Sequence, residues 1–577
     1  MNPLDTPDPP DDAKARRAEA RRLPTWDLGP VQLCDLELLL NGGFAPLVGF
    51  LGEADHRSVL ERERLADGAL WPMPITLDVS ERFAEGLALG SRVTLLHPEG
   101  VPLAVLTVES LFRPDRTAEA EAVLGTSDPA HPWARHLQTG VEPVCLGGAL
   151  EALDPVPHAV FRRHRHTPAE LRAEFTRRGW SRVVAFQTRN PLHRAHVELV
   201  RRAAEIADAS ILLHPVVGRT QPGDVDAFSR LRCYEAVLPH FERPCLLSVL
   251  PLAMRMAGPR EAIWHALIRK NHGATHFIVG RDHAGPAPRP DGRAFYGPLE
   301  AQQRALALAG EIGLEILPFE EMVYRPDVDR YEPRSAVPVG SPVAALSGTE
   351  QRRLLRDGLP LPTYFTYPEV ERELRRAHPP RAQQGLVVFM TGLSGAGKST
   401  IAQVLAKRLE EIGPRRVTLL DGDIVRQHLS SELSFSRQHR DLNVTRIGWV
   451  ASEVARHGGI AICAPIAPYA AARRQVREQC GDGGFYEVHV ATPIAVCEQR
   501  DRKGLYAKAR AGLLKGFTGI DDPYEEPEAP ELRIDASLDS AEDAAERILD
   551  TLRSAGFLPP TSGATSGTIS GASAAAR

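Results

Sequence analysis

A glycine-rich loop, Gly392–Ser399 (Gly-Leu-Ser-Gly-Ala-Gly-Lys-Ser), restricts what the C-terminal third of this chain can fold into. It directly follows the apolar run Leu386–Met390 and precedes a helical pattern in which Ile401, Leu405 and Leu409 share one face. Glycines let backbone N–H groups turn inward around phosphate oxygens, and the positive end of a helix adds to the attraction. The alternative, a glycine-rich turn without a ligand, is disfavoured by the flanking strand and helix patterns. The loop therefore predicts an ATP-handling domain built on a parallel α/β sheet.

Two side chains of this loop have expected chemical roles. We expect Lys398 to reach the β- and γ-phosphates, and the Ser399 hydroxyl to ligate the Mg²⁺ that enters with ATP. The next strand, Val417–Leu420, leads into Asp421 and Asp423, at the edge where ligands bind in open α/β sheets. Taken singly, each of these carboxylates would more often be a solvated loop residue. The residues expected to contact ATP here are Gly392, Leu393, Ser394, Gly395, Ala396, Gly397, Lys398, Ser399 and Thr400.

The composition is that of a globular protein with several domains, with 577 residues of which 43% are hydrophobic and 25% charged. The formal net charge of −5 is small for this length and argues against a nucleic-acid partner. The seven cysteines are scattered and form no C-x-x-C pair, which predicts a reduced protein without a disulfide framework. No apolar run approaches the roughly 18 residues of a membrane span, and no signal-peptide pattern is present. We therefore expect a cytoplasmic protein with no membrane partner.

Changes in sequence pattern divide the chain into segments. Short apolar runs between Gly/Pro turns, such as Val93–Leu96, give way near Thr167 to alternating strand and helix patterns. A polar, proline-containing stretch then precedes the second strand and helix series. The predicted segments are a disordered arm (1–22), a β-rich domain (23–166), a Rossmann-like α/β domain with a small C-terminal subdomain (167–376), a linker (377–384), the P-loop domain (385–557) and a disordered tail (558–577).

The first α/β segment carries two polar loops, each at the end of a predicted strand. Residues 187–196 follow the strand Val183–Phe186, and residues 280–285 follow the strand His276–Val279. Because the carboxyl ends of parallel strands share one sheet edge, the two loops are expected to meet at one nucleotide. His193 and His196 lie three residues apart at the positive end of a helix, which favours an anion such as a triphosphate. A zinc pair, or ordinary core or surface histidines, are the alternatives for these two residues taken alone.

Residues 385–557 resemble adenylyl-sulfate kinase. The matching segments are Gly392–Thr400, Asp421–Arg426, Phe435–Ser436, Arg440–Asn443, Lys503–Arg510 and Phe517–Glu525, in the order found in that family. The resemblance implies that Lys398 is catalytic and that Asp421 or Asp423 orients or deprotonates a 3′-hydroxyl, with no choice between the two. It also implies a set of residues that bind adenylyl sulfate, namely Arg426, Phe435, Arg440, Asn443, Ile466, Lys503 and Phe517.

Residues 23–376 resemble ATP sulfurylase, which implies a PUA-like fold for the β-rich domain. Beyond the two loops, the matches are Gly42–Leu47, His214–Gly218, Arg230–Glu235, Met254–Arg260, Phe295–Pro298 and Ser347–Thr349. The implied sulfate-binding residues are Gln187, Arg189 and Ala284. The implied ATP contacts are Gln187, Thr188, Arg189, Asn190, Gly280, Arg281, Asp282, His283 and Val323, and the implied catalytic residues are Thr188, Arg189, Asn190, His193 and His196. Some relatives carry a cysteine-built zinc site, but Met322–Gly340 has no cysteine, so no zinc is expected.

One residue departs from the kinase pattern. The family usually has a serine, described as a phosphoryl-accepting residue, where this chain has Ala467. A covalent phosphoserine at this position is therefore impossible. Phosphoryl transfer depends mainly on positioning and charge neutralisation, so we expect an active kinase with direct in-line transfer.

Together the two halves predict a two-step sulfate-activating enzyme. ATP and sulfate would give adenylyl sulfate, and a second ATP would then phosphorylate its 3′ position. One alternative is an active sulfurylase with a degenerate, regulatory kinase-like domain. The other is a sulfurylase that works in the reverse direction and makes ATP from adenylyl sulfate and pyrophosphate. The expected partners are ATP, sulfate and adenylyl sulfate, with Mg²⁺ bound to ATP, and we expect a homo-oligomer.

Overall fold

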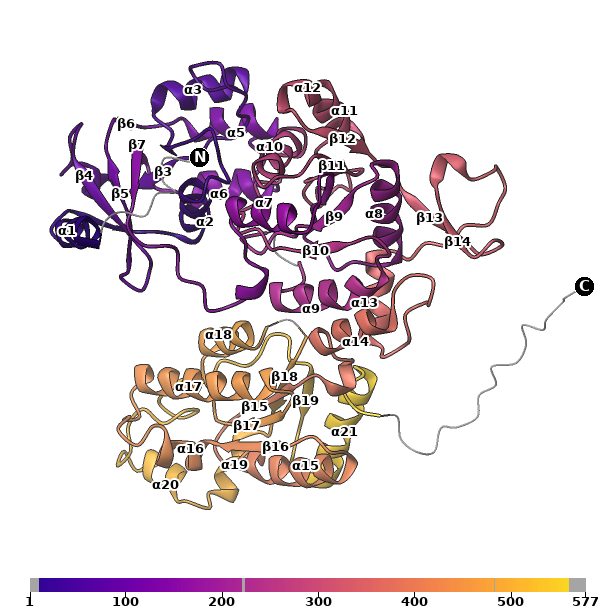
Figure 1. Cartoon of the computed structure of the whole chain (residues 1–577). Coiled ribbons are helices and arrows are strands. Elements are labelled where there is room, and N and C mark those ends of the chain that lie inside the picture. The colour runs from indigo at the N-terminus through magenta and orange to yellow at the C-terminus, as the bar shows by residue number, and fades with distance from the viewer. Residues whose placement is uncertain (1–9, 221–223, 482, 560–577) are drawn as a thin grey trace, which may run out of the picture. The chain divides into compact units, whose positions relative to one another are not determined.

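The computed structural model describes residues 10–220, 224–481 and 483–559, and these form two compact units. The first unit contains the chain up to Ser347 together with Leu361–Ala377, and the second contains Gly348–Pro360 and the chain from His378 onward. Figure 1 shows the elements of each unit. Within the described ranges, no helix is both long and apolar enough to cross a membrane.

The N-terminal part of the first unit is a mostly antiparallel sheet with short helices, which confirms the β-rich prediction. Its strands follow the order β1-β4-β5-β7-β2, with β3 and β6 also paired to the long strand β7. Because β7 is bordered by several partners, its side chains are almost all covered. The strands are β1 Thr25–Asp27, β2 Gly49–Phe50, β3 Leu77–Val79, β4 Arg92–Leu96, β5 Pro102–Thr107, β6 Ser110–Phe112 and β7 Val144–Ala152. The helices are α1 Pro10–Ala20, α2 Pro30–Leu40, α3 Glu53–Arg62, α4 Glu81–Ala84, α5 Arg116–Leu124 and α6 Pro132–Thr139.

The predicted disordered arm is wrong for residues 10–20, which form helix α1. Ala20 is 1% exposed, and its carbonyl oxygen accepts a hydrogen bond from Thr94 Oγ1 at 2.7 Å. Arg17 forms a two-pronged ion pair with Asp154. These are contacts with distant residues, which the polar local sequence could not indicate. Residues 1–9 of the predicted arm and residues 560–577 of the predicted tail lie outside the described residues.

The rest of the first unit is a doubly wound α/β domain, as predicted. All its five sheet strands are parallel, in the order β10-β9-β8-β11-β12. The chain winds in one direction from β8 and returns on the other side at β11, so the topological switch point lies between these two strands. The strands are β8 Val183–Phe186, β9 Ser210–Leu213, β10 Cys245–Leu247, β11 His276–Val279 and β12 Glu315–Pro318, and a separate hairpin joins β13 Met322–Arg325 to β14 Arg330–Pro333. The helices are α7 Pro168–Arg177, α8 Arg194–Ile206, α9 Ala227–Val237, α10 Gly258–Asn271, α11 Glu300–Ala307, α12 Ala309–Ile312 and α14 Pro368–Ala377.

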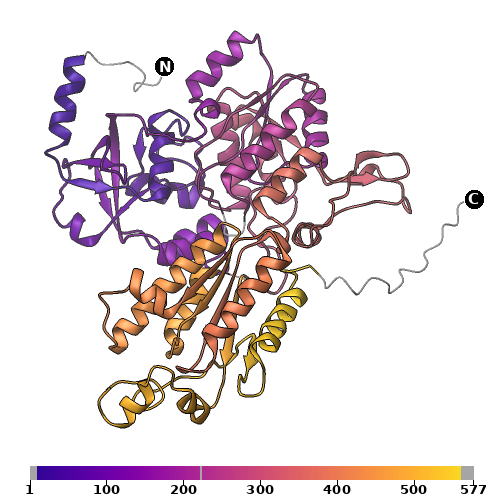
Figure 2. The ribbon, with the colours of Figure 1, turned by 90° about the horizontal axis from the view of Figure 1, so that it is seen from below.

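The second unit is a parallel five-stranded sheet with helices on both faces, in the order β16-β17-β15-β18-β19. One face is covered by apolar residues of α15 and α21, and the opposite face by those of α17 and α18. Figure 2 shows α21, in yellow, alongside this sheet. The strands are β15 Leu386–Thr391, β16 Val417–Asp421, β17 Ile460–Ala464, β18 Phe485–Val490 and β19 Leu532–Ile534. The helices are α13 Gly348–Arg356, α15 Lys398–Ile412, α16 Gly422–His428, α17 Arg437–Arg456, α18 Ala470–Cys480, α19 Ile494–Arg500, α20 Leu505–Arg510 and α21 Ala541–Ser554, and single 3-10 turns in the chain lie at Arg162–His164, Leu238–His240, Arg334–Ala336 and Arg381–Gln383.

Candidate functional site

The glycine-rich loop of the second unit connects β15 to α15 in a conformation that requires glycine. Gly397 has φ +106° and precedes the first residue of α15. A Cβ on Gly392 would lie 2.4 Å from the carbonyl oxygen of Val490. No larger residue fits these positions without moving backbone atoms. The backbone N–H groups of the loop and the N-terminus of α15 therefore surround the same space, as in a phosphate-binding site.

Lys398 begins α15 and folds back over its own loop. Its Nζ donates to the carbonyl oxygens of Gly392 at 2.9 Å and Leu393 at 2.7 Å. The residue is 7% exposed, and burial lowers the pKa of Lys398 to about 8. Both of these hydrogen-bond partners are neutral carbonyl oxygens, so an anion that enters the loop would supply a charged partner for the buried ammonium.

Three charged or polar groups stand beside the loop. The Ser399 hydroxyl donates to Asp421 Oδ2 at 2.6 Å, and Asp421 also caps helix α16 by accepting from the backbone N–H of Asp423. Asp423 in turn forms an ion pair with Lys503. The candidate metal ligand and both candidate carboxylates therefore lie at one edge of the sheet.

A cavity of about 910 Å³ joins this loop to most of the residues expected to bind adenylyl sulfate. Of that set, Arg426, Phe435, Arg440, Asn443, Ile466 and Lys503 line the cavity, together with Lys398, Ser399, Asp421 and Asp423. Phe517 is not part of this lining. It is partly buried against the core and packs edge-on against Tyr506, which does line the cavity.

The cations and the amide of this cavity are held by specific contacts. Arg426 donates to the carbonyl oxygen of Leu433 at 2.9 Å and stacks over Phe435, at 4.3 Å from the ring centroid. Arg440 forms an ion pair with Asp522 at 2.9 Å. Asn443 is 7% exposed, and within the described structure its buried Oδ1 has no hydrogen-bond partner. The cavity thus presents fixed cations, an exposed aromatic ring and an unused amide oxygen.

In the first unit, the two predicted loops meet at the switch point between β8 and β11. These strands are direct neighbours, with Phe277 opposite Ala185. Arg189, in the loop after β8, pairs with Asp224 at 2.7 Å and donates to the carbonyl oxygen of Gly285, in the loop after β11, at 3.3 Å. The structure therefore brings the two loops into direct contact.

The loop after β8 is also held by a hydrogen bond within the loop and by one from helix α9. Thr188 Oγ1 accepts from the backbone N–H of Asn190 at 3.1 Å, and Tyr234 donates to the carbonyl oxygen of Asn190 at 3.0 Å. Gln187 donates weakly to Met254 Sδ at 3.8 Å, and its buried Oε1 has no partner in the described part of the chain.

His193 and His196 stand at the start of α8. His196 Nδ1 accepts from the backbone N–H of His193 at 3.2 Å, so His196 caps the helix with its own ring. His193 Nδ1 lies 3.0 Å from Thr366 Oγ1, and its ring packs on Phe365. Burial lowers the pKa of His193 to about 3 and that of His196 to about 4. Both imidazoles are therefore neutral at physiological pH.

The loop after β11 adopts an unusual backbone shape. Asp282 and Ala284 have φ values of +51° and +54°, which few non-glycine residues adopt. His283 is held by His265, with 3.0 Å between His283 Nε2 and His265 Nδ1. Val323, on β13, is 2% exposed. Gly280 and Arg281 complete the loop, and Arg281 pairs with its neighbour Asp282 at 3.2 Å.

Comparison with known proteins identifies the family. Family models match residues 6–155 as a PUA-like domain, residues 162–377 as ATP-sulfurylase and residues 384–535 as Adenylylsulphate kinase. The sulfate adenylyltransferase of Emericella nidulans is 51% identical over 546 residues, covering 94% of this chain and 95% of its own length. That of Phaeosphaeria nodorum is 50% identical with the same coverage. This chain belongs to the sulfate adenylyltransferase family.

A solved structure extends the sulfate adenylyltransferase comparison to the kinase half. It is the hexameric APS kinase from Thiobacillus denitrificans, which is 38% identical, covers 95% of this chain and 97% of its own, and superimposes with a TM-score of 0.78. The chain therefore combines an ATP-sulfurylase domain and an adenylylsulfate kinase domain, as its sequence predicted.

Sequence reasoning missed several residues of the kinase cavity in this chain. Arg500 and Tyr506 line the cavity, as do Ala536 and Asp539. Tyr506 lies inside the quoted segment Lys503–Arg510, so its position there was a usable signal. The others lie outside any motif, and only the folding of α19 and the start of α21 against the loop brings them in.

Proposed function

We propose that this chain converts ATP and sulfate to adenylyl sulfate in its first unit and phosphorylates the 3′-hydroxyl of adenylyl sulfate in its second. The observation that carries the proposal is the kinase cavity, in which an intact phosphate loop and six of the seven expected adenylyl-sulfate residues line one space. The family membership supports both activities. The product of the two steps is 3′-phosphoadenylyl sulfate.

In the first step, sulfate attacks the α-phosphorus of ATP and pyrophosphate leaves. Sulfate is fully ionised near neutral pH and needs no general base, so the site has to reduce repulsion between two anions and stabilise charge at the α-phosphorus. Arg189 supplies a fixed cation at the contact between the two loops. His193 and His196, neutral because they are buried, act as hydrogen-bond donors rather than as cations.

For the same step, we assign sulfate to Gln187, Arg189 and Ala284. Two observations support a ligand at this point: the buried Gln187 Oε1 has no hydrogen-bond partner among the described residues, and Ala284 has φ +54°. We assign ATP to Gln187–Asn190, Gly280–His283 and Val323.

In the second step, the 3′-hydroxyl attacks the γ-phosphorus of ATP in line with the leaving ADP. Lys398 stabilises the charge on the phosphates, and Arg426, Arg440 and Lys503 meet the anionic groups of the acceptor. Ala467 lines the cavity but has no hydroxyl, so the phosphoryl group passes directly to the acceptor.

Mg²⁺ fits the oxygen pair formed by Ser399 and Asp421, whose side chains are 2.6 Å apart. When bound with ATP, this ion neutralises phosphate charge in the transition state. Because Asp421 faces Ser399, we assign Asp423 to the acceptor 3′-hydroxyl. Among the residues that the structure describes, no group of three or more His, Cys, Asp and Glu side chains could hold a metal ion.

The test is a coupled assay of the intact chain beside Lys398→Ala and His196→Ala. We expect Lys398→Ala to abolish 3′-phosphorylation alone and His196→Ala to lower adenylyl transfer alone, by about 10²- to 10³-fold, the usual loss for one stabilising donor. Lys407→Ala, an exposed lysine on the same helix α15, is the matched control and should leave both rates unchanged. Loss of both activities in either site variant would contradict two separate sites.

The second candidate is an active sulfurylase with a regulatory kinase-like unit. It is favoured by Ala467 and by the fungal relatives, which carry the name sulfate adenylyltransferase alone. The intact loop and its buried Lys398 disfavour it. Transfer of ³²P from γ-labelled ATP to adenylyl sulfate by the intact chain supports the kinase. Tight binding of the nucleotide without transfer, with a change in sulfurylase KM, supports the regulatory role.

We also propose a homo-oligomeric, cytoplasmic enzyme. The related APS kinase structure is described as hexameric, which supports the first point. All seven cysteines are free, which suits a reducing compartment. Sedimentation equilibrium of the full chain tests the assembly.

A further inference from the structure

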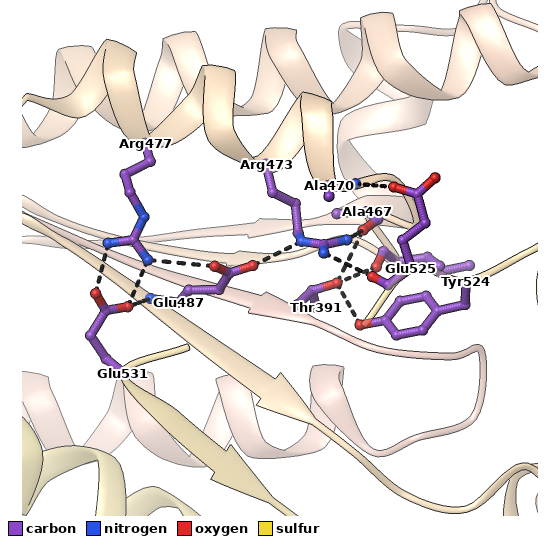
Figure 3. A network of polar contacts seen from close by, with 10 residues as sticks. Thr391, Ala467, Ala470, Arg473, Arg477, Glu487, Tyr524, Glu525 and Glu531 are labelled. Atoms are coloured by element: carbon purple, nitrogen blue, oxygen red, sulfur yellow. Dashed lines mark hydrogen bonds and ion pairs between the residues drawn. The ribbon is translucent and has the colours of Figure 1, made fainter. Parts of the chain in front are cut away.

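Arg473 is a buried arginine near the kinase cavity that no motif singles out. It lies on α18 and is 3% exposed. Its guanidinium donates to the carbonyl oxygens of Ala467 and Glu525, each at 2.8 Å, and pairs with Glu487 at 2.8 Å. Figure 3 shows Arg473 at the centre of this network. All three nitrogens of the guanidinium therefore have a partner in a covered position.

One acceptor belongs to a loop that forms a wall of the cavity. Ile466, Ala467 and Pro468 all line the cavity, and this loop follows β17. Ala467 has φ +46°, a conformation that is unfavourable for a residue with a Cβ. Thr391, the last residue of β15, donates to the carbonyl oxygen of Ile466 at 2.7 Å. Thr391 Oγ1 also lies 3.2 Å from the carbonyl oxygen of Ala467, so Thr391 and Arg473 together hold this strained loop.

The other acceptor belongs to the segment that holds Arg440. Glu525 donates from its backbone N–H to the carbonyl oxygen of Pro468 at 2.8 Å, and its carboxylate accepts from the backbone N–H of Ala470 at 2.7 Å. A few residues earlier, Asp522 pairs with Arg440, a cation of the cavity. Arg473 therefore joins a loop that lines the cavity to the segment that holds Arg440.

The neighbouring Arg477 provides a comparison one helical turn away. It contacts the same carboxylate, Glu487, at 3.4 Å and pairs with Glu531 at 2.7 Å. In Figure 3, Arg477 points to Glu487 and Glu531, whereas Arg473 points to the loop carbonyls. The two arginines share a counter-charge, but their other partners differ. The guanidinium has five N–H donors in a fixed planar fork, so it can hold two carbonyl oxygens and a carboxylate at once.

We propose that Arg473 is a positioning residue for adenylyl sulfate. It fixes the Ile466–Pro468 loop and the segment that carries Asp522, and so shapes the acceptor side of the cavity without contacting the reacting atoms. The inference rests on the proposed kinase function. The glycine-rich loop meets this wall where the backbone N–H of Gly392 donates to the carbonyl oxygen of Ile466 at 3.2 Å. Lys398 is held by carbonyl oxygens of its own loop, so we expect ATP binding to depend less on Arg473 than adenylyl-sulfate binding does.

The test compares Arg473→Met with Arg477→Met in the full chain. We expect Arg473→Met to raise the KM for adenylyl sulfate by about tenfold or more, with the KM for ATP within about twofold, because small misplacements of a bound reactant have large effects. Arg477→Met should leave both constants within about twofold of the original. Arg473→Lys, which retains the charge but not the fork, should fall between. An equal rise in both KM values for Arg473→Met would overturn the proposal.

A second variant distinguishes a positioning role of Arg473 from a role in which it only balances the charge of Glu487. Arg473→Met leaves Glu487 with one partner fewer, which itself destabilises a buried pair. The double variant Arg473→Met/Glu487→Met removes both charges, so it should recover the melting temperature while the KM for adenylyl sulfate stays high. Recovery of the original KM in the double variant would show that Arg473 only balances a charge, and would overturn the proposal.

Calorimetric titration with adenylyl sulfate in the presence of ADP measures the binding of adenylyl sulfate directly, so this test does not depend on catalytic turnover. If the original chain binds adenylyl sulfate but does not phosphorylate it, the proposed function fails, and weaker binding by Arg473→Met still supports the positioning role. If the original chain does not bind adenylyl sulfate, both proposals are overturned.

Discussion

At the scale of single residues, Lys398 links ATP binding to pH. Burial lowers the pKa of this amine to about 8 in the nucleotide-free loop. A bound triphosphate favours the charged form and raises the pKa again, so binding takes up a proton wherever the free lysine is neutral. At about pH 8.5 we expect an uptake of roughly 0.7 proton per ATP, and little uptake at pH 7. Affinity for ATP should accordingly fall as the pH rises through 8.

Titration calorimetry in two buffers with different ionisation enthalpies measures this uptake directly. The Lys398→Arg variant is the control, since its side chain stays charged at every pH used and should take up no proton. Equal proton uptake by the two proteins would assign the effect to another group and contradict the role of Lys398.

At the scale of elements, α1 is ordered by its contacts and not by its own sequence. Thr94, which is fully buried on β4, donates to the carbonyl oxygen of Ala20 at 2.7 Å. Replacing Thr94 by Val removes this hydrogen bond and leaves the carbonyl with the longer one from the backbone N–H of Leu23 at 3.4 Å, which should lower the free energy of unfolding by about 0.5–1.5 kcal/mol. Thr94→Ser retains the hydroxyl and should lose less. Urea unfolding followed by tryptophan fluorescence reports mainly on the first unit, which holds five of the six tryptophans. Equal losses in the two variants would mean that the hydrogen bond contributes nothing.

Elements built on continuous apolar runs could be predicted from the sequence, whereas elements ordered by distant partners could not. The strands Val183–Phe186 and His276–Val279 have the predicted bounds because parallel strands are covered on both faces and read as uninterrupted apolar segments. Helix α1 was missed because its low apolar content hides the contacts that order it.

The residues of the candidate sites also fall into two groups: those that the sequence could predict and those that it could not. Motifs located six of the seven expected adenylyl-sulfate residues in the lining of the kinase cavity, since the carboxyl edge of a parallel sheet collects its loops. The network of Arg473 left no sequence signal, because its partners include backbone carbonyls, which every residue has. The position of Phe517, packed on Tyr506 and away from the cavity lining, also depends on how a loop folds back.

At the scale of the whole molecule, the two units hold separate sites and separate cores. In the first unit an apolar cluster extends from the β-rich part onto the α/β sheet, and two others cover the two faces of the second unit's sheet. Every residue assigned to adenylyl transfer lies in the first unit, and every residue assigned to 3′-phosphorylation lies in the second. Neither step needs a side chain from the other unit, so inactivation of one site leaves the other complete.

This separation predicts that two singly inactivated chains complement each other. Formation of adenylyl sulfate from ATP and sulfate is uphill, and 3′-phosphorylation draws it forward. A mixture of Lys398→Ala and His196→Ala chains, supplied with ATP, sulfate and pyrophosphatase, should therefore form 3′-phosphoadenylyl sulfate although neither variant does so alone at a comparable rate. Adenylyl sulfate must then pass through solvent, so the mixture should show a longer lag than the unmodified chain, and dilution should lengthen the lag. Product formation by the unmodified chain but none by the mixture would mean that the intermediate is not released, and the two units would then have to act as one site.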